Sequence, residues 1–151
     1  MKTIGQADIL TMRRTGFLAS QKSPAYSIIK SYDWAKEARG KGDCIICGNH
    51  SQIEKDVFEI LFKGNQPLIL MLARGMKKRW EPQLLQEVEK GRLLILSPFE
   101  DHVSRVTRET AEIRNKAMIE LANEIVVGHA RPGGQLERLL RGKDYISLSN
   151  S

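Results

Sequence analysis

Short apolar runs alternate with longer segments of mixed polarity along most of the chain. The apolar runs are residues 16–20, 44–47, 67–73, 93–96 and 125–127. Runs of consecutive apolar residues are typical of strands that are buried on both faces of a parallel sheet. In the segments between them, apolar residues recur every three or four positions, as on one face of a helix. The pattern therefore predicts a domain in which strands and connecting helices alternate.

Several of the predicted helices have recognisable end signals. Ser23 and Pro24 are expected to start the first helix, because a hydroxyl cap followed by proline is a common helix start. The segment Gly40-Lys41-Gly42 is expected to end that helix. Ser51 and Glu54 have the spacing of a capping box at the start of the second helix. The remaining expected elements are helices at residues 81–90, after residue 107 and at 136–140, and a short last strand at 145–146.

The expected organisation is one Rossmann-like domain over residues 1–151, with three layers and a mostly parallel sheet of five to six strands. Residues 1–15 show no firm period and are predicted to be an N-terminal extension. No apolar run approaches the ~20 residues that span a bilayer, and the N-terminus lacks the apolar core of a signal peptide. We therefore expect a cytoplasmic protein with no membrane partner.

The two cysteines, Cys44 and Cys47, have the C-x-x-C spacing of redox pairs and of half a metal site. Here, however, the four residues form an apolar run, and no histidine is spaced to complete a zinc site. We therefore expect two buried thiols, which suit a reducing compartment, and no metal and no cofactor.

Charge and the residues that follow the strands point to an anionic partner. The net charge is +6, which favours nucleic acid or phosphorylated ligands, although a merely solvated basic surface explains it equally well. Ligands of open parallel sheets bind at the carboxyl ends of the strands, near the reversal of strand order. The residues there are rich in hydroxyls, glycines and cations, and we call them the strand-end rim. Its candidate phosphate- or nucleic-acid-binding residues are Ser20, Lys22, Gly48, Asn49, Arg74, Lys77, Gly133 and Gly134.

Several familiar chemistries have no motif in this chain. No G-x-G-x-x-G follows the first strand and no P-loop is present, which argues against a dinucleotide cofactor and against a P-loop NTPase. The histidines are isolated, and none is placed by the sequence beside a nucleophile. The residues therefore favour a binding protein over an enzyme.

Two segments resemble one bacterial family. Residues 47–54, C-G-N-H-S-Q-I-E, are similar to its S-G-x-A-x-G-I-D pattern, with Gly48 and Ile53 identical and Glu54 in place of aspartate. Arg114 and Asn115, followed by an apolar helix and a strand, are similar to its R-N-R-I pattern. In this order of motifs, residues 15–141 resemble the Rossmann-like domain of the DNA processing protein A (Smf) family of recombination mediators. The resemblance adds Arg114 and Asn115 to the candidate site residues.

A second, more distant resemblance concerns the last glycine loop. Pro132, Gly133, Gly134 and Glu137 are similar to part of the P-G-G-x-G-T-x-x-E loop of the cytokinin-activating phosphoribohydrolases. That resemblance implies a nucleotide held at the glycines, with Glu137 assisting its hydrolysis.

Three hypotheses for the function stay open at this point. The first is binding of single-stranded DNA across the strand-end rim, which the resemblance to DNA processing protein A implies. The second is binding, with or without hydrolysis, of a nucleotide or a nucleotide derivative. The third is a non-catalytic interaction domain, such as one that forms a homo-oligomer. In the first hypothesis, the phosphates are neutralised by Lys22, Arg74, Lys77, Lys78 and Arg114.

Overall fold

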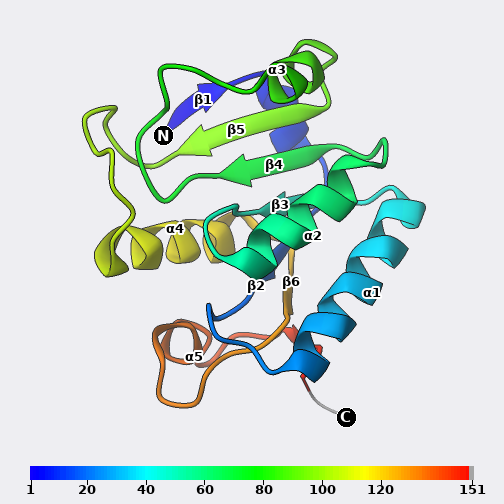
Figure 1. The fold of residues 1–151 in the computed structure, drawn as a ribbon, viewed down its shortest axis with the longest axis vertical. Coiled ribbons are helices and arrows are strands. Elements are labelled where there is room, and N and C mark those ends of the chain that lie inside the picture. Colours follow the sequence, from blue (N-terminus) through cyan, green and yellow to red (C-terminus); the bar gives the residue numbers. More distant parts are fainter. Residues whose placement is uncertain (150–151) are drawn as a thin grey trace.

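The structure is a computed structural model and describes residues 1–149. Its centre is a seven-stranded sheet in the order β1-β5-β4-β3-β2-β6-β7 (Figure 1). The strands are β1 (Lys2–Ile4), β2 (Arg14–Leu18), β3 (Cys44–Cys47), β4 (Leu68–Met71), β5 (Leu93–Ser97), β6 (Glu124–Val127) and β7 (Ile146–Ser147). Every neighbouring pair is parallel except β1 and β5. The predicted α/β domain with a mostly parallel sheet is confirmed.

Strand order reverses at β2, and this reversal decides where a ligand can bind. The chain lays β3, β4 and β5 one after another on one side of β2. It then returns to place β6 on the other side, so that Thr15 of β2 lies between Ile45 of β3 and Glu124 of β6. The connection from β2 to β3 crosses one face of the sheet, and the connection from β5 to β6 crosses the other face. A crevice therefore opens at the carboxyl ends of β2 and β6, where the strand order reverses.

Helices cover both faces of the sheet, because alternate residues of each strand point to opposite faces. On one face lie α1 (Ala25–Lys41), α2 (Gln52–Phe62) and α3 (Pro82–Glu89), which pack on side chains such as Phe17 and Ile45. On the other face lie α4 (Arg108–Leu121), α5 (Gln135–Leu139) and the 3-10 helix η1 (Ala7–Thr11), which pack on side chains such as Leu18 and Ile46. The predicted three-layer architecture therefore has two separate apolar cores.

Most apolar residues of the predicted core strands are buried as expected, whereas Ile29 of α1 and Ile113 of α4 are 59% and 48% exposed. Trp34 of α1 stacks on Phe17 at 5.2 Å between ring centroids. Cys44 and Cys47 are free and buried thiols on β3, and burial raises the pKa of Cys44 to about 11 and raises that of Cys47 as well. No helix in the described part of the chain is long and apolar enough to cross a membrane.

The N-terminus differs from the expected extension. Lys2–Ile4 pair with β5 as an antiparallel edge strand, and Ile9 of η1 is only 1% exposed. These three strand residues are too few to show a period in the sequence. With β7 they bring the sheet to seven strands rather than five or six.

Two element boundaries also differ from the prediction. The first core strand begins at Arg14 rather than at residue 16, because the Arg14 guanidinium donates to the carbonyl oxygens of Met12 and Leu121, at 2.6 and 2.9 Å, and can therefore lie in the strand. Helix α1 begins at Ala25 with Pro24 as its N-cap. Ser23 does not cap it, because its hydroxyl donates instead to the Ser20 carbonyl at 2.9 Å.

The burial of Ile9 makes a testable prediction about the N-terminal segment. Replacing Ile9 by Ala should lower the free energy of unfolding by about 2–5 kcal/mol, because the lost side chain leaves a cavity in the core. Ile29→Ala is the matched control, since Ile29 is 59% exposed on α1 and should change stability by no more than about 0.5 kcal/mol. Urea denaturation measures both. Equal effects of the two substitutions would show that η1 is not docked on the sheet.

Candidate nucleic-acid interface

A cavity of about 480 Å³ opens at the carboxyl ends of β2 and β6, where the strand order reverses. Four segments form it: the loop after β2, the start of α2 with the loop before it, the start of α4, and the loop from β6 into α5. The lining includes residues 19–22, 106–108 and 134–136, together with His50, Glu54, Ala111, Arg114, Asn115 and Arg131. We call this the switch-point cavity.

Hydrogen bonds donated by backbone amides hold the two loops of the crevice in place. The Ser20 amide donates to the carbonyl oxygen of His129 at 2.8 Å, and the Arg131 amide donates to the Ser20 hydroxyl at 2.9 Å. In the second loop, the Gly133 amide donates to the Glu137 carboxylate at 2.9 Å. Glu137 therefore closes the glycine loop on itself, and it is not among the residues that line the cavity.

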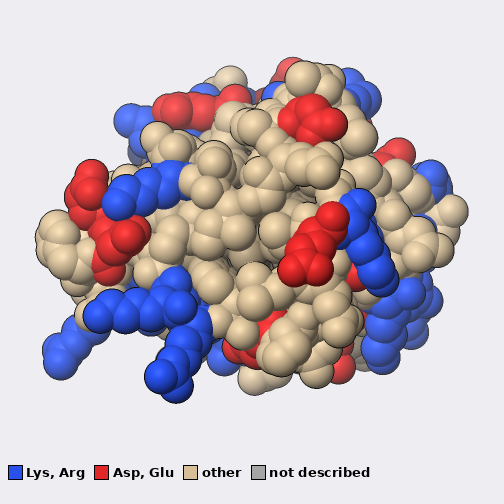
Figure 2. All heavy atoms as spheres, turned by 90° about the horizontal axis from the view of Figure 1, so that it is seen from above, with Lys and Arg blue, Asp and Glu red and all other residues tan. Residues whose placement is uncertain are grey.

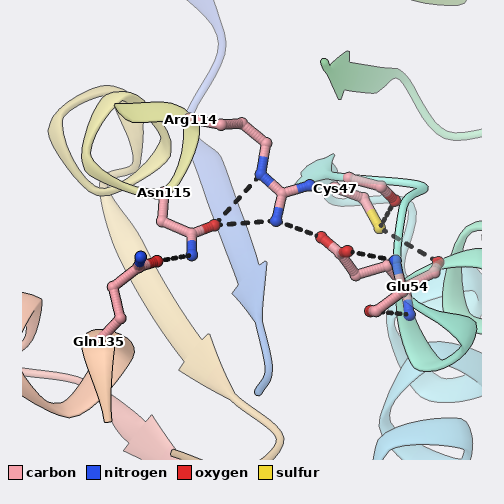
Figure 3. A network of polar contacts seen from close by, with 7 residues as sticks. Cys47, Glu54, Arg114, Asn115 and Gln135 are labelled. Atoms are coloured by element: carbon pink, nitrogen blue, oxygen red, sulfur yellow. Dashed lines mark hydrogen bonds and ion pairs between the residues drawn. The ribbon is translucent and has the colours of Figure 1, made fainter. Parts of the chain in front are cut away.

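The floor of the cavity is a buried ion pair. Arg114 of α4 and Glu54 of α2 meet at 2.6 Å between Nη2 and Oε2, with side chains 6% and 3% exposed (Figure 3). The other carboxylate oxygen of Glu54 accepts from the Ser51 amide at 2.8 Å, as the predicted capping box requires. Glu54 is therefore both the capping residue of α2 and the counter-ion of Arg114.

The ion pair continues into a chain of amides. The Asn115 oxygen accepts from Nε and Nη2 of Arg114 at 3.2 and 2.9 Å. The Asn115 amide group then donates to the Gln135 oxygen at 3.5 Å, and Gln135 donates to the Arg108 carbonyl at 3.1 Å (Figure 3). One network thus links α2, α4 and α5 across the floor.

Gly48 has a steric reason to be glycine. A Cβ at this position would lie 2.1 Å from Nη1 of Arg114 and 2.3 Å from the Glu54 carboxylate. Gly48 comes directly after β3, so the end of that strand packs against the ion pair. The two segments that resemble DNA processing protein A, around Gly48 and around Arg114, therefore meet in space.

Positive charge is concentrated at the mouth of the cavity. Lys22, Arg108 and Arg131 are exposed lining residues, and within residues 1–149 none of them forms an ion pair. The only lining carboxylate in the described chain, Glu54, is already neutralised by Arg114. The α2 and α4 N-termini also face this region with their partial positive charge. The mouth is therefore suited to an anion.

The edge of the sheet at β1 carries charges of both signs. The edge of the sheet at β1, seen from above in Figure 2, carries Lys and Arg side chains beside Asp and Glu side chains. In this part of the molecule Lys2 pairs with Glu100 and Asp101 at 3.3 and 3.2 Å, and Glu87 pairs with Lys90 at 3.0 Å. This edge differs from the cavity mouth, where Lys22, Arg108 and Arg131 have no ion-pair partner in the described chain.

The structure brings together only part of the predicted set of site residues. Ser20, Lys22, Arg114, Asn115 and Gly134 line the switch-point cavity. Gly48 packs against its floor, and Asn49 and Gly133 lie in the adjoining loops without lining it. Arg114 is buried and paired rather than presented on an exposed helix face.

Arg74 and Lys77 lie in the loop after β4, outside the cavity. The Arg74 side chain donates to the Gly75 carbonyl at 3.2 Å. Lys77 pairs with Glu81 at 3.8 Å and sits 5.5 Å from the centre of the Trp80 ring. In this part of the strand-end rim, Arg74 and Lys77 thus already have partners within the chain.

The candidate residues did not include Arg108, Arg131 and Gln135. Arg131 lies in the same loop as Gly133, so its position after a strand could have identified it as a candidate site residue. Arg108 is the first residue of α4, where the helix dipole disfavours a cation. A cation at a helix start is a sign that something other than helix stability placed it there.

Solved structures with the same architecture belong to DNA processing protein A. The protein from Helicobacter pylori superposes with a TM-score of 0.72 and 16% identity, covering 96% of this chain and 69% of that one. The protein from Streptococcus pneumoniae gives 0.73 and 15%, covering 99% of this chain and 54% of that one. This chain has the Rossmann-like fold of DNA processing protein A. The expected resemblance is thus confirmed for the fold, and the chain spans about half the length of the S. pneumoniae protein.

Other comparisons set the limits of this likeness. A molybdenum cofactor binding protein from Rippkaea orientalis resembles this chain more distantly. Its TM-score is 0.59 and its identity 9%, and the match covers 90% of this chain and 76% of that one. No protein-family model and no curated protein matches the sequence. The likeness therefore lies in three-dimensional structure rather than in sequence.

The buried ion pair can be tested by a double-mutant cycle. Glu54→Gln and Arg114→Met should each destabilise the protein by about 3–5 kcal/mol, because each leaves one charge buried without its partner. The double variant E54Q/R114M should lose clearly less than the sum, because it leaves no unpaired charge. Chemical denaturation of the four proteins gives the coupling energy. Simple additivity would show that the two charges do not depend on each other.

Proposed function

We propose that this chain binds single-stranded DNA, with backbone phosphates at the mouth of the switch-point cavity. The observation that carries the proposal is the set of three cations, Lys22, Arg108 and Arg131, that converge on this mouth without carboxylate partners in the described chain. Neutralising phosphates with Lys and Arg releases counterions, which drives binding to nucleic acid. The H. pylori neighbour is described by its single-stranded DNA binding mode, which supports the same partner here.

The position of the cavity suits single-stranded DNA that lies along the carboxyl edge of the sheet. Neighbouring strands are about 4.8 Å apart, so a ligand that leaves the cavity past β3 reaches the loop after β4 within two strand spacings. Arg74 and Lys77 lie in that loop and would extend the contact. Because Lys77 is already paired with Glu81, it should contribute less than the three cations at the mouth.

The structure offers less support for hydrolysis. Glu137, the residue that the phosphoribohydrolase resemblance puts forward, holds the Gly133 amide and does not line the cavity. Binding without catalysis is therefore the function that the geometry supports best. The buried thiols of Cys44 and Cys47 agree with a reducing compartment, so we propose that the protein acts in the cytoplasm.

Self-association also stays a proposal. Tyr145 and Ile146, next to and within the edge strand β7, are 44% and 51% exposed, and Tyr26 and Ile29 of α1 are 41% and 59% exposed. Contacts of Tyr26 and Ser27 with Ser149 place the two segments close together. An apolar surface of this kind would suit a second copy of the chain.

The salt dependence of binding tests the proposed site. Log affinity for single-stranded DNA should fall linearly with log salt, and each phosphate contact contributes a slope of about 0.7. Arg108→Ala and Arg131→Ala should each weaken binding and lower the slope by about 0.7. Arg141→Ala is the matched control, because Arg141 is exposed, lies outside the cavity and makes no ion pair in the described chain.

Fluorescence anisotropy over a salt series measures these slopes. An absence of binding by the unmodified protein at low salt would overturn the proposed function. If Arg108→Ala and Arg131→Ala lower the salt slope no more than the control Arg141→Ala does, the DNA binds elsewhere on the molecule.

A further inference from the structure

The glycine loop between β6 and α5 contains one tight turn over residues 131–134. Pro132 and Gly133 are its two central residues, and the Gly134 amide closes it by donating to the Arg131 carbonyl oxygen at 2.9 Å. Gly133 has a φ of +74°, and proline followed by a residue with positive φ is the pattern of a type II turn. A Cβ built at Gly133 would meet nothing within 4 Å. The positive φ, and not a lack of space, therefore favours glycine at this position.

The backbone donors of this turn are all in use. The Arg131 amide donates to the Ser20 hydroxyl at 2.9 Å, and the Gly133 amide donates to the Glu137 carboxylate at 2.9 Å. The closing amide of the turn is used as well, and Pro132 has no N–H group. A phosphate therefore finds no free backbone donor in the turn, although both of its glycines are candidate phosphate-binding residues. The turn offers an anion only the side chain of Arg131.

Glu137 fixes the orientation of the central peptide of the turn. It is the third residue of α5, and its carboxylate accepts from the N–H of the peptide that joins Pro132 to Gly133. In a type I turn, the two dihedral angles that flank this peptide differ by roughly 150–170° from those of a type II turn, which reverses the direction of the N–H. A hydrogen bond to an ionised acceptor is stronger than one between neutral groups. Glu137 therefore selects the type II conformation.

The side chain of Arg131 lies against this turn. A Cβ built at Gly134 would be 3.2 Å from Nε of Arg131 and 3.4 Å from its Cβ, so the arginine side chain lies across the glycine. The backbone of Arg131 is held by the turn and by Ser20. The guanidinium is thus presented at the mouth in a restricted set of orientations. A side chain that is already ordered loses less conformational entropy when it binds a ligand.

We propose that Glu137 is a positioning residue for phosphate binding, which holds the type II turn and thereby the cation of Arg131 without contacting the DNA itself. The inference rests on the proposed function and adds to it a carboxylate that favours the binding of an anion. Charge alone predicts the reverse, because a carboxylate near the mouth repels a phosphate. The sign of the effect of removing Glu137 therefore distinguishes positioning from simple electrostatics.

Two charge-removing substitutions test this sign. Glu137→Ala should weaken binding of a single-stranded oligonucleotide about two- to tenfold, because Arg131 must then be ordered when the phosphate binds. Glu109→Ala is the matched control and should strengthen binding slightly, because Glu109 is exposed in the first turn of α4 beside Arg108 and does not line the cavity. Glu137→Gln keeps an acceptor for the Gly133 amide and should not weaken binding.

A glycine substitution disturbs the turn without changing any charge. Gly133→Ala puts a side chain at a positive φ, which is strained, but in open space, so it should weaken binding in the same direction as Glu137→Ala. Gly42→Ala is the matched control, because Gly42 has a φ of +78° and equally open surroundings but lies at the end of α1, just before β3 begins. In an Arg131→Ala background, neither Glu137→Ala nor Gly133→Ala should weaken binding further. Thermal melting checks that every variant is folded at the binding temperature.

Amide hydrogen exchange, followed by NMR, examines the turn without DNA. The Gly133 amide should exchange more slowly in the unmodified protein and in Glu137→Gln than in Glu137→Ala, because only the first two proteins keep its acceptor. Equal exchange rates in all three proteins would show that Glu137 does not hold the turn, which overturns the inference.

The binding outcomes separate this inference from the proposed function. Unchanged or tighter binding by Glu137→Ala would overturn the inference and leave phosphate binding in place, and so would a Glu137→Gln variant that binds as weakly as Glu137→Ala. A loss from Glu137→Ala that persists in the Arg131→Ala background would show that Glu137 does not act through Arg131, which also overturns the inference. An absence of binding by the unmodified protein at low salt would overturn the proposed function itself.

Discussion

The buried ion pair between Glu54 and Arg114 is the contact on which the rest of the site depends. It joins the start of α2 to the middle of α4 at 2.6 Å, and these helices lie on opposite faces of the sheet. Two charges taken out of water are tolerated only when each is matched and hydrogen-bonded. The Ser51 amide bonds to Glu54 and the Asn115 oxygen bonds to Arg114, whereas Nη1 of Arg114 is buried with no hydrogen-bond partner in the described chain.

This constraint explains the electrostatics of the cavity. Because Arg114 neutralises Glu54, the floor carries no net charge, and the positive field at the mouth comes from the exposed cations together with the N-termini of α2 and α4. Because the pair occupies the space beside Gly48, a side chain at this position would displace Arg114 and Glu54 from each other. The floor is thus rigid and neutral, while the mouth is exposed and positive.

The sequence could predict the fold well because its evidence is local. Consecutive apolar residues identify strands such as β3, and the Ser51–Glu54 spacing identifies the start of α2. The partners of these elements are a different matter. Nothing in the sequence of Glu54 indicates that a residue of α4 neutralises it, and nothing places β6 rather than β5 beside β2. The candidate set therefore contained Lys22 and Arg114 as equivalent cations, although one is exposed and the other is buried and paired.

Exposed cations such as Lys22 and the buried, paired Arg114 also differ in how readily they can be replaced. A phosphate at an exposed mouth responds to the summed field of the cations within roughly a Debye length, about 8–10 Å. The same field can therefore come from different loops. Here the arginines at the mouth come from the start of α4 and from the β6–α5 loop. The buried pair has no such freedom, because a buried charge requires its own partner at contact distance. These two physical rules together predict that the pair of Glu54 and Arg114 tolerates substitution less well than the exposed cations at the mouth do.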